Sequence, residues 1–238
     1  MCRFFIMRII PYNGFMKPVN NSSANNLYDF FVYRKAEEAC RILDFGRDQW
    51  QADGGSEAGR TVCGQSGDAT DAAGVLRALD LIIEGNRLRS RHGLNALAVT
   101  DELMAMAAVN ANMSAVIRAH WMGLRQSYGL QYTGENLAWG YDNPFEGWYE
   151  EEGRLYESGS RSGVGHYLNL VNPEQEPERD YVACGFGLVT KPGILVTACH
   201  EFAAAYGAGT TPKGVRITTE NAIPAEEYRD AFMKFITE

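Results

Sequence analysis

Gly134-Glu135-Asn136-Leu137-Ala138-Trp139-Gly140 places one carboxylate inside an otherwise apolar segment that is flanked by glycines. A carboxylate buried in such a segment has to be hydrogen-bonded, paired with a cation or bound to a metal ion. Taken alone, Glu135 could equally be a loop carboxylate that accepts backbone N–H bonds. The segment therefore gives the first candidate of a functional site, but not its chemistry.

A second acidic segment follows at residues 148–152. Glu151 comes three residues after Trp148, which places it beside the buried face of a predicted helix. Glu152, four residues after Trp148, competes for the same position. Taken alone, Glu151 could be one member of a solvated acidic run. We take Glu151 as the second candidate carboxylate.

The chain has four histidines, and two of them, His120 and His166, lie where a predicted element meets a glycine-containing loop. Histidine and carboxylate together suit a divalent transition metal, and they also suit general acid and base roles. The competing interpretations are a satisfied core histidine for His120 and a loop end for His166. His92 is expected at the end of a helix, and His200 on the outer face of a strand.

Caps and hydrophobic spacing predict helices first and an antiparallel meander afterwards. Asp71 and Thr100 are suited to cap two helices, and Asp142-Asn143-Pro144 begins a third whose buried face includes Trp148. The first helix is expected over residues 72–92, and the apolar stripe of the second runs to His120. Strands are expected over 166–171, 181–190 and 194–204, and a terminal helix over 225–237. The predicted class is α+β, with helices packed on a short antiparallel sheet.

Charge and hydropathy exclude two classes of function. The 238 residues carry 22 Lys and Arg against 30 Asp and Glu, a formal charge of −8, so a nucleic acid would be repelled. No apolar run approaches the roughly 20 residues that cross a bilayer. Residues 1–11 resemble a signal peptide only weakly, because Arg8 interrupts the apolar stretch.

Composition divides the chain into three parts. Residues 52–74 are rich in Gly, Ser, Ala, Asp and Thr and are expected to form a linker. Residues 1–70, with a possible helix over 27–43, are an appendage of unknown role. The main domain is expected over 71–206, and residues 207–238 are a C-terminal extension.

Five cysteines form an odd and sparse set without a C-x-x-C pair, which predicts neither a zinc ribbon nor a dense disulfide framework. Cys184 and Cys199 lie on consecutive predicted strands and could face each other. The alternative is two buried free thiols.

Several motifs occur together in one order, and this order resembles the CAP superfamily of cysteine-rich secretory, antigen 5 and pathogenesis-related proteins. The motifs are Asn86 and Arg89 before Gly93-Leu94, His120, the run from Gly134 to Trp139, Trp148-x-x-Glu151 and Gly165-His166-Tyr167. The resemblance covers roughly residues 72–204. Asn172-Pro173 stands where a tryptophan is usual, and the paired cysteines of secreted members are absent, which resembles a bacterial form.

The resemblance implies an α-β-α sandwich with a cleft formed by His120, Glu135, Glu151 and His166. The two histidines would bind zinc or another divalent cation weakly, while the glutamates orient them or hold a water. Trp148 and Tyr167 would contact a ligand. An extracellular or cell-surface location follows from the resemblance alone.

Three functions are compatible with these residues. The preferred one is a non-catalytic binding module for a lipid, peptide or protein ligand. The alternative is a metal-assisted, peptidase-like hydrolase, in which an ion on His120 and His166 activates water and Glu135 or Glu151 accepts the proton. The third is a surface interaction protein with a vestigial cleft, whose residues 1–70 contact the partner.

Overall fold

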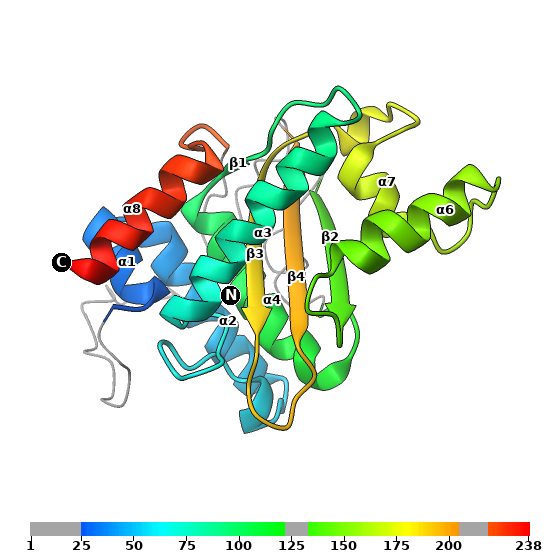
Figure 1. The fold of residues 1–238 in the computed structure, drawn as a ribbon. Helices are drawn as coiled ribbons and strands as arrows, with labels where there is room; N and C mark the ends of the chain where they lie inside the picture. Colours follow the sequence, from blue (N-terminus) through cyan, green and yellow to red (C-terminus); the bar gives the residue numbers. More distant parts are fainter. Residues whose placement is uncertain (1–24, 122–132, 205–218) are drawn as a thin grey trace, which may run out of the picture.

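The computed structural model describes residues 25–121, 133–204 and 219–238 (Figure 1). Its helices are α1 (Leu27–Arg34), α2 (Glu37–Ala52), α3 (Ala72–Ser90), α4 (Asp101–Ile117), α6 (Glu152–Glu157), α7 (Gly165–Val171) and α8 (Ala225–Thr237). A π-helical turn, η2 (Glu146–Glu151), leads into α6, and short 3₁₀ turns occupy Glu57–Gly59 (η1) and Pro177–Arg179 (η3). The strands are β1 (Ala98–Val99), β2 (Thr133–Trp139), β3 (Tyr181–Val189) and β4 (Thr197–Ala204).

These strands form one sheet in the order β1-β3-β4-β2, with β1 parallel to β3 and the other pairs antiparallel. The sheet lies between α3 on one face and α4 on the other (Figure 1). The predicted α+β class and α-β-α sandwich are therefore confirmed, and the added β1 makes the sheet mixed. Strand β2 is an edge of this sheet, which matters because it carries Glu135.

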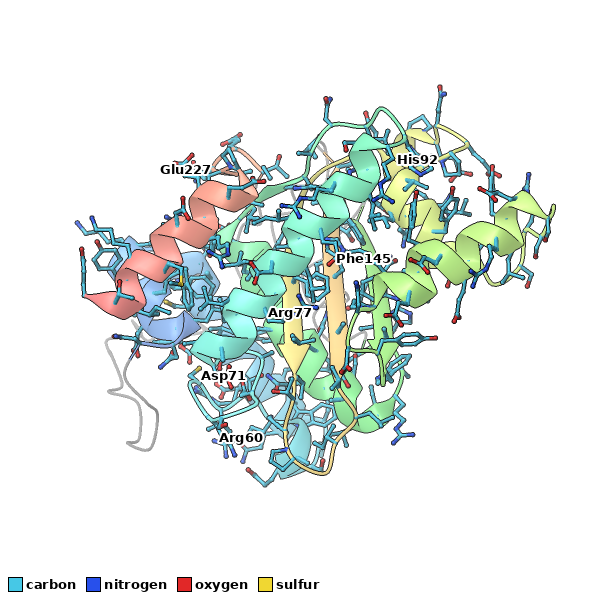
Figure 2. All side chains as sticks on the ribbon, viewed as in Figure 1. Arg60, Asp71, Arg77, His92, Phe145 and Glu227 are labelled. Atoms are coloured by element: carbon cyan, nitrogen blue, oxygen red, sulfur yellow. The ribbon has the colours of Figure 1, made fainter. Side chains whose placement is uncertain are left out.

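Local capping chemistry fixes the long helices where the sequence predicts them. The Asp71 side chain accepts the backbone N–H of Gly74 at the start of α3, and Thr100 Oγ1 accepts that of Leu103 at the start of α4, at 3.1 Å. Figure 2 shows Asp71 at one end of α3 and His92 just beyond the other. The terminal helix α8 has the predicted bounds.

Two motif residues of α3 connect the layers. Asn86 exchanges hydrogen bonds with both backbone groups of Leu97, at 2.8 and 2.9 Å. The buried Arg89 guanidinium donates to the carbonyl of Leu170 at 2.7 Å and to that of Asn95 at 3.1 Å. Burial lowers the pKa of Arg89 from its ordinary value. These bonds hold α7 against the start of the sheet.

Residues 166–171 were predicted as a strand and instead belong to helix α7. The buried side chains of this segment are Tyr167, Leu170 and Val171, spaced three and four residues apart. That is the spacing of one helical face, whereas a half-buried strand would alternate. The run was too short to distinguish the two periods from sequence.

The described part of the first 70 residues, from Asn25 onward, does not stand apart from the core. Leu27, Phe30, Phe31 and Trp50 of α1 and α2 are buried in the same hydrophobic cluster as the sheet, and α2 packs on α4. The single helix expected over 27–43 is two helices, because Lys35 adopts a left-handed conformation with φ of 60°.

Within the predicted linker, residues 52–74, the buried residues are concentrated in 59–70. Asp68 is fully buried, accepts the Val62 N–H at 3.0 Å and the Thr70 hydroxyl at 2.7 Å, and forms an ion pair with Lys191 at 3.0 Å. Small residues here allow close approach to the β3–β4 hairpin, which composition alone does not show. These contacts attach this part of the expected linker to the β3–β4 hairpin.

Cys184 and Cys199 cannot face each other. Cys184 lies opposite Phe202 in the register and Cys199 opposite Gly187, so their side chains point to different faces of the sheet. The described cysteines, Cys40, Cys63, Cys184 and Cys199, form no disulfide with one another. In the described ranges, we find no helix whose length and apolar character would let it cross a membrane.

Candidate functional site

His120 lies three residues beyond the end of α4, and its ring contacts edge strand β2. Helix α4 ends at Ile117 because Arg118 takes a left-handed conformation, so the predicted stripe does not reach His120 as helix. The Nδ1 atom of His120 pairs with Oε1 of Glu135. The His120 side chain is 50% exposed and that of Glu135 only 2%. A buried carboxylate thus holds a surface imidazole.

His166 has a partner of the same kind, but that partner is Glu152. Its Nδ1 lies 2.5 Å from Glu152 Oε1. The other oxygen of Glu152 accepts the backbone N–H groups of His166 and Tyr167, at 2.9 and 3.1 Å. Glu152 therefore orients the His166 ring and also caps the first turn of α7.

Glu151, the residue chosen from sequence, is exposed, and its carboxylate accepts a hydrogen bond from the Tyr141 hydroxyl at 3.4 Å. The reason lies in η2, whose residues form a π-helix. A π-helical turn contains more residues than an α-helical turn, so the position facing α7 falls one residue later than the three-residue spacing predicts. The competing position, Glu152, holds the contact with His166.

Both histidine–carboxylate pairs lie against edge strand β2. Glu135 and Asn136 are consecutive in the strand and therefore point to opposite sides of the sheet. Glu135 binds His120, whereas Asn136 Nδ2 donates to the backbone carbonyl of His166 at 3.0 Å. Asn169 of α7 in turn donates to Asn136 Oδ1 at 2.9 Å. Strand β2 therefore contacts both histidines, one through Glu135 and the other through Asn136.

Residues 84–188 match the family model of CAP, the cysteine-rich secretory protein family. This segment resembles a CAP domain. The match includes both histidine–carboxylate pairs and ends within β3, before β4 begins. No curated protein matches the chain.

In this CAP-like segment, the two aromatic residues expected to contact a ligand are packed inside. Trp148 is 2% exposed and donates its indole N–H to the Leu137 carbonyl at 3.0 Å. Tyr167 is 5% exposed and packs against Tyr149 and Tyr156. Both therefore support the site from behind and offer almost no surface to a ligand.

The remaining histidines differ from each other. His92 is exposed at the end of α3, as expected, and its Nε2 lies 3.0 Å from the Tyr149 hydroxyl. His200 was expected on an outer face and is instead buried, with its ring packed against Trp148, Phe186 and Phe202. The outer-face prediction was wrong because both faces of the sheet are covered by helices.

A group that the sequence did not single out lies on the α4 side of the sheet. One oxygen each from Glu135 and Glu201 and the Cys199 sulfur lie within 4.8 Å of one another, and all three residues are buried. These three side chains could hold a metal ion. In sequence, the only sign is the two-residue spacing of Cys199 and Glu201, which places them on one strand face.

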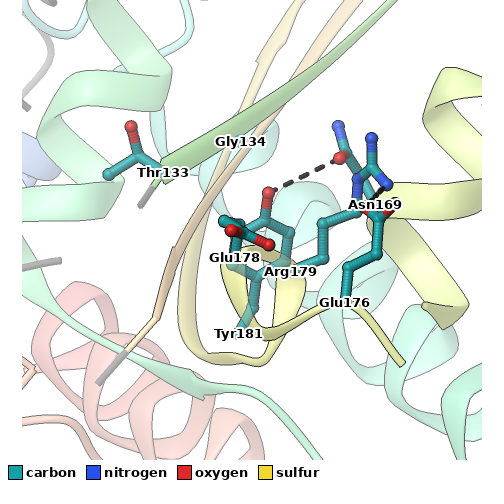
Figure 3. Close-up of a pocket in the computed structure, with 7 residues that line it drawn as sticks. All are labelled: Thr133, Gly134, Asn169, Glu176, Glu178, Arg179 and Tyr181. Atoms are coloured by element: carbon teal, nitrogen blue, oxygen red, sulfur yellow. Dashed lines mark hydrogen bonds and ion pairs between the residues drawn. The ribbon is translucent and has the colours of Figure 1, made fainter. Parts of the chain in front are cut away.

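A separate, polar pocket of about 720 Å³ lies at the start of β2 (Figure 3). Inside it, the Tyr181 hydroxyl donates to Asn169 Oδ1 at 3.5 Å. The residues that line it are Thr133, Gly134, Asn169, Glu176, Glu178, Arg179 and Tyr181. Neither histidine pair contributes to this lining.

The cap geometry leads to a stability prediction. Glu152→Ala removes the acceptor of two backbone N–H groups and is expected to lower the free energy of unfolding by about 1–2 kcal/mol. Glu151→Ala removes an exposed side chain and is expected to cost less than about 0.5 kcal/mol. Urea denaturation of both variants measures the difference. Equal effects would contradict the assignment of Glu152 as the cap.

Proposed function

We propose that the CAP-like segment is a non-catalytic binding module that holds a divalent metal ion on His120 and His166 next to a lipid, peptide or protein ligand. One observation carries the proposal: each imidazole is engaged through Nδ1 by a carboxylate, Glu135 or Glu152. This leaves Nε2 of both rings as the nitrogen for a ligand or ion.

The residues fit such an ion chemically. Metal-binding histidines commonly donate their second ring nitrogen to a carboxylate, which fixes the tautomer and raises the basicity of the ligating nitrogen. The side chains of His120 and His166 are 50% and 32% exposed, so solvent ions reach them. When bound, the ion supplies a positive charge and open coordination positions for oxygen groups of a ligand.

The carboxylates have separate roles in this proposal. Glu135 is buried behind His120 and fixes the ring from inside the sheet, while Glu152 fixes His166 and the N-terminal turn of α7 together. We propose that the protein acts outside the cell, which is supported by the match to a family described as secretory.

Zinc titration calorimetry tests the proposal. We expect the wild-type protein to take up more zinc than the His120→Ala/His166→Ala double variant, with both shown to be folded by circular dichroism. Glu152→Gln is expected to weaken this uptake by roughly 10- to 100-fold, since it keeps the shape but loses the charge that orients His166.

The matched control is His92→Ala, which removes an exposed histidine that contacts Tyr149 and should leave zinc uptake unchanged. Equal uptake by the wild type and the double variant would refute the metal role. Peptide hydrolysis that disappears on chelation and in Glu135→Gln would replace the binding module with a metal-assisted hydrolase.

A further inference from the structure

The face of the sheet that is covered by α4 carries polar side chains from two strands at one level. In the antiparallel register of β2 and β4, Glu135 lies opposite Glu201, and Leu137 lies opposite Cys199. Glu135, Cys199 and Glu201 therefore share one face. Cys199 Sγ lies 3.5 Å from Glu135 Oε2 and 3.8 Å from Glu201 Oε1.

From this juxtaposition we propose a second, interior metal site, in which Glu135, Cys199 and Glu201 bind a zinc-class divalent ion. The distances from the Cys199 sulfur to the two carboxylate oxygens match those between ligands of one zinc ion. Zinc binds thiolate sulfur at about 2.3 Å and carboxylate oxygen at about 2.0 Å, so a tetrahedral site separates sulfur from oxygen by about 3.5 Å. The observed separations of 3.5 and 3.8 Å are close to this value before any ion is added.

Asn110 of α4 completes the group from the other side. Its Nδ2 lies 2.8 Å from Glu135 Oε2 and 2.7 Å from Glu201 Oε1. Asn110 is fully buried, yet its Oδ1 has no hydrogen-bond partner, which is costly for a carbonyl oxygen. Rotation of the amide by half a turn directs Oδ1 toward the ion as a fourth donor.

One turn further along α4, the buried Ser114 hydroxyl also lacks a partner. Residues four apart share a helix face, so Asn110 and Ser114 extend the polar lining toward the sheet.

The donor set selects the class of ion. A thiolate favours zinc, cobalt(II) and similar borderline ions, whereas calcium and magnesium prefer oxygen ligands alone. Binding breaks the S–H bond of Cys199 and forms a metal–sulfur bond, and the proton leaves to solvent. Affinity is therefore expected to rise with pH. The site shares Glu135 with the proposed His120 site, but it does not depend on His166.

Cobalt(II) is the probe, because a cobalt–thiolate bond gives a charge-transfer absorption in the near ultraviolet that nitrogen and oxygen ligands do not give. The metal-free full-length protein is incubated with cobalt(II) until the spectrum is constant, since burial of the three ligands predicts slow entry. We expect the band in the wild type and its bleaching by zinc.

Cys199→Ser is expected to abolish the band, and Glu201→Gln to weaken cobalt binding by roughly tenfold or more. Cys184→Ser is the matched control, because Cys184 is a fully buried cysteine, as Cys199 is, but lies on the opposite face of the sheet. The His120→Ala/His166→Ala variant is expected to keep the band, which separates this site from the proposed function.

Absence of the band in the wild type, or its persistence in folded Cys199→Ser, would overturn the proposal. If circular dichroism shows that Cys199→Ser does not fold, the decision rests on Glu201→Gln, which keeps the side-chain shape. Unchanged band intensity and cobalt affinity in that variant would then overturn the site.

Discussion

Gly185→Ala is expected to lower the free energy of unfolding by about 3 kcal/mol, the upper end of what overpacking a core costs. A Cβ atom at this position of β3 would lie 2.1 Å from the carbonyl carbon and oxygen of Leu103 and 2.4 Å from the backbone nitrogen of Met104. All three are backbone atoms of α4 and cannot rotate away. The helix would have to move off the sheet to admit one methyl group.

Urea denaturation followed by circular dichroism gives the measurement. Gly165→Ala serves as the control, because a Cβ there meets no atom within 4 Å and the backbone conformation suits any residue. We expect that variant to stay within about 0.5 kcal/mol of the wild type. If Gly185→Ala and Gly165→Ala lowered the free energy of unfolding by similar amounts, α4 and β3 would not be as closely packed as in the structure.

Features with local causes were predictable from the sequence. Asp71, Thr100 and Pro224 mark helix starts through their own side-chain chemistry, and helices α3, α4 and α8 begin directly after them. The fold class followed from the order of these elements. Two of the four site residues selected from sequence, His120 and Glu135, form a pair in the structure.

Features decided by packing were not predictable. All eight residues of β4 are buried, so the strand has no polar alternation to show which side chains face which helix. For this reason His200 was assigned to the outside, and Cys199 and Glu201 were not recognised as partners of Glu135. Which β4 residues lie beside Glu135 is decided by the register between β2 and β4, and the sequence of one strand does not contain that register.

The structure pairs His166 with Glu152, whereas the sequence analysis selected Glu151, and this difference has another cause. Motif spacing was converted to a helix face with the α-helical period, whereas residues Glu146–Glu151 form a π-helix. The two carboxylates are chemically equal, so only the backbone geometry decides which one meets His166.

His200 is expected to make the protein markedly less stable in acid. Its ring is fully buried, with centroids 4.0 Å from Phe202 and 5.0 Å from Phe186, and neither ring nitrogen has a hydrogen-bond partner. Burial, and to a smaller extent the positive charge of Arg89, lowers the pKa of His200 from 6.5 to about 3. The folded protein therefore holds this imidazole neutral.

Below pH 6.5 the unfolded chain binds a proton at His200 that the folded protein does not, so stability falls as the pH drops from about 6.5 to about 3. At about 1.4 kcal/mol per pKa unit, the full loss is on the order of 4–5 kcal/mol. The stabilisation is fully present above pH 6.5 and absent below the folded pKa.

Urea denaturation at pH 7 and pH 4 measures this loss in the wild type and in His200→Leu. We expect His200→Leu to lose much less stability than the wild type between pH 7 and pH 4, because a leucine fills the apolar site without a titratable nitrogen. His92→Leu removes an exposed imidazole and is expected to keep the wild-type acid dependence. If His200→Leu and the wild type lose the same unfolding free energy between pH 7 and pH 4, protonation of His200 is not the cause of the loss in acid.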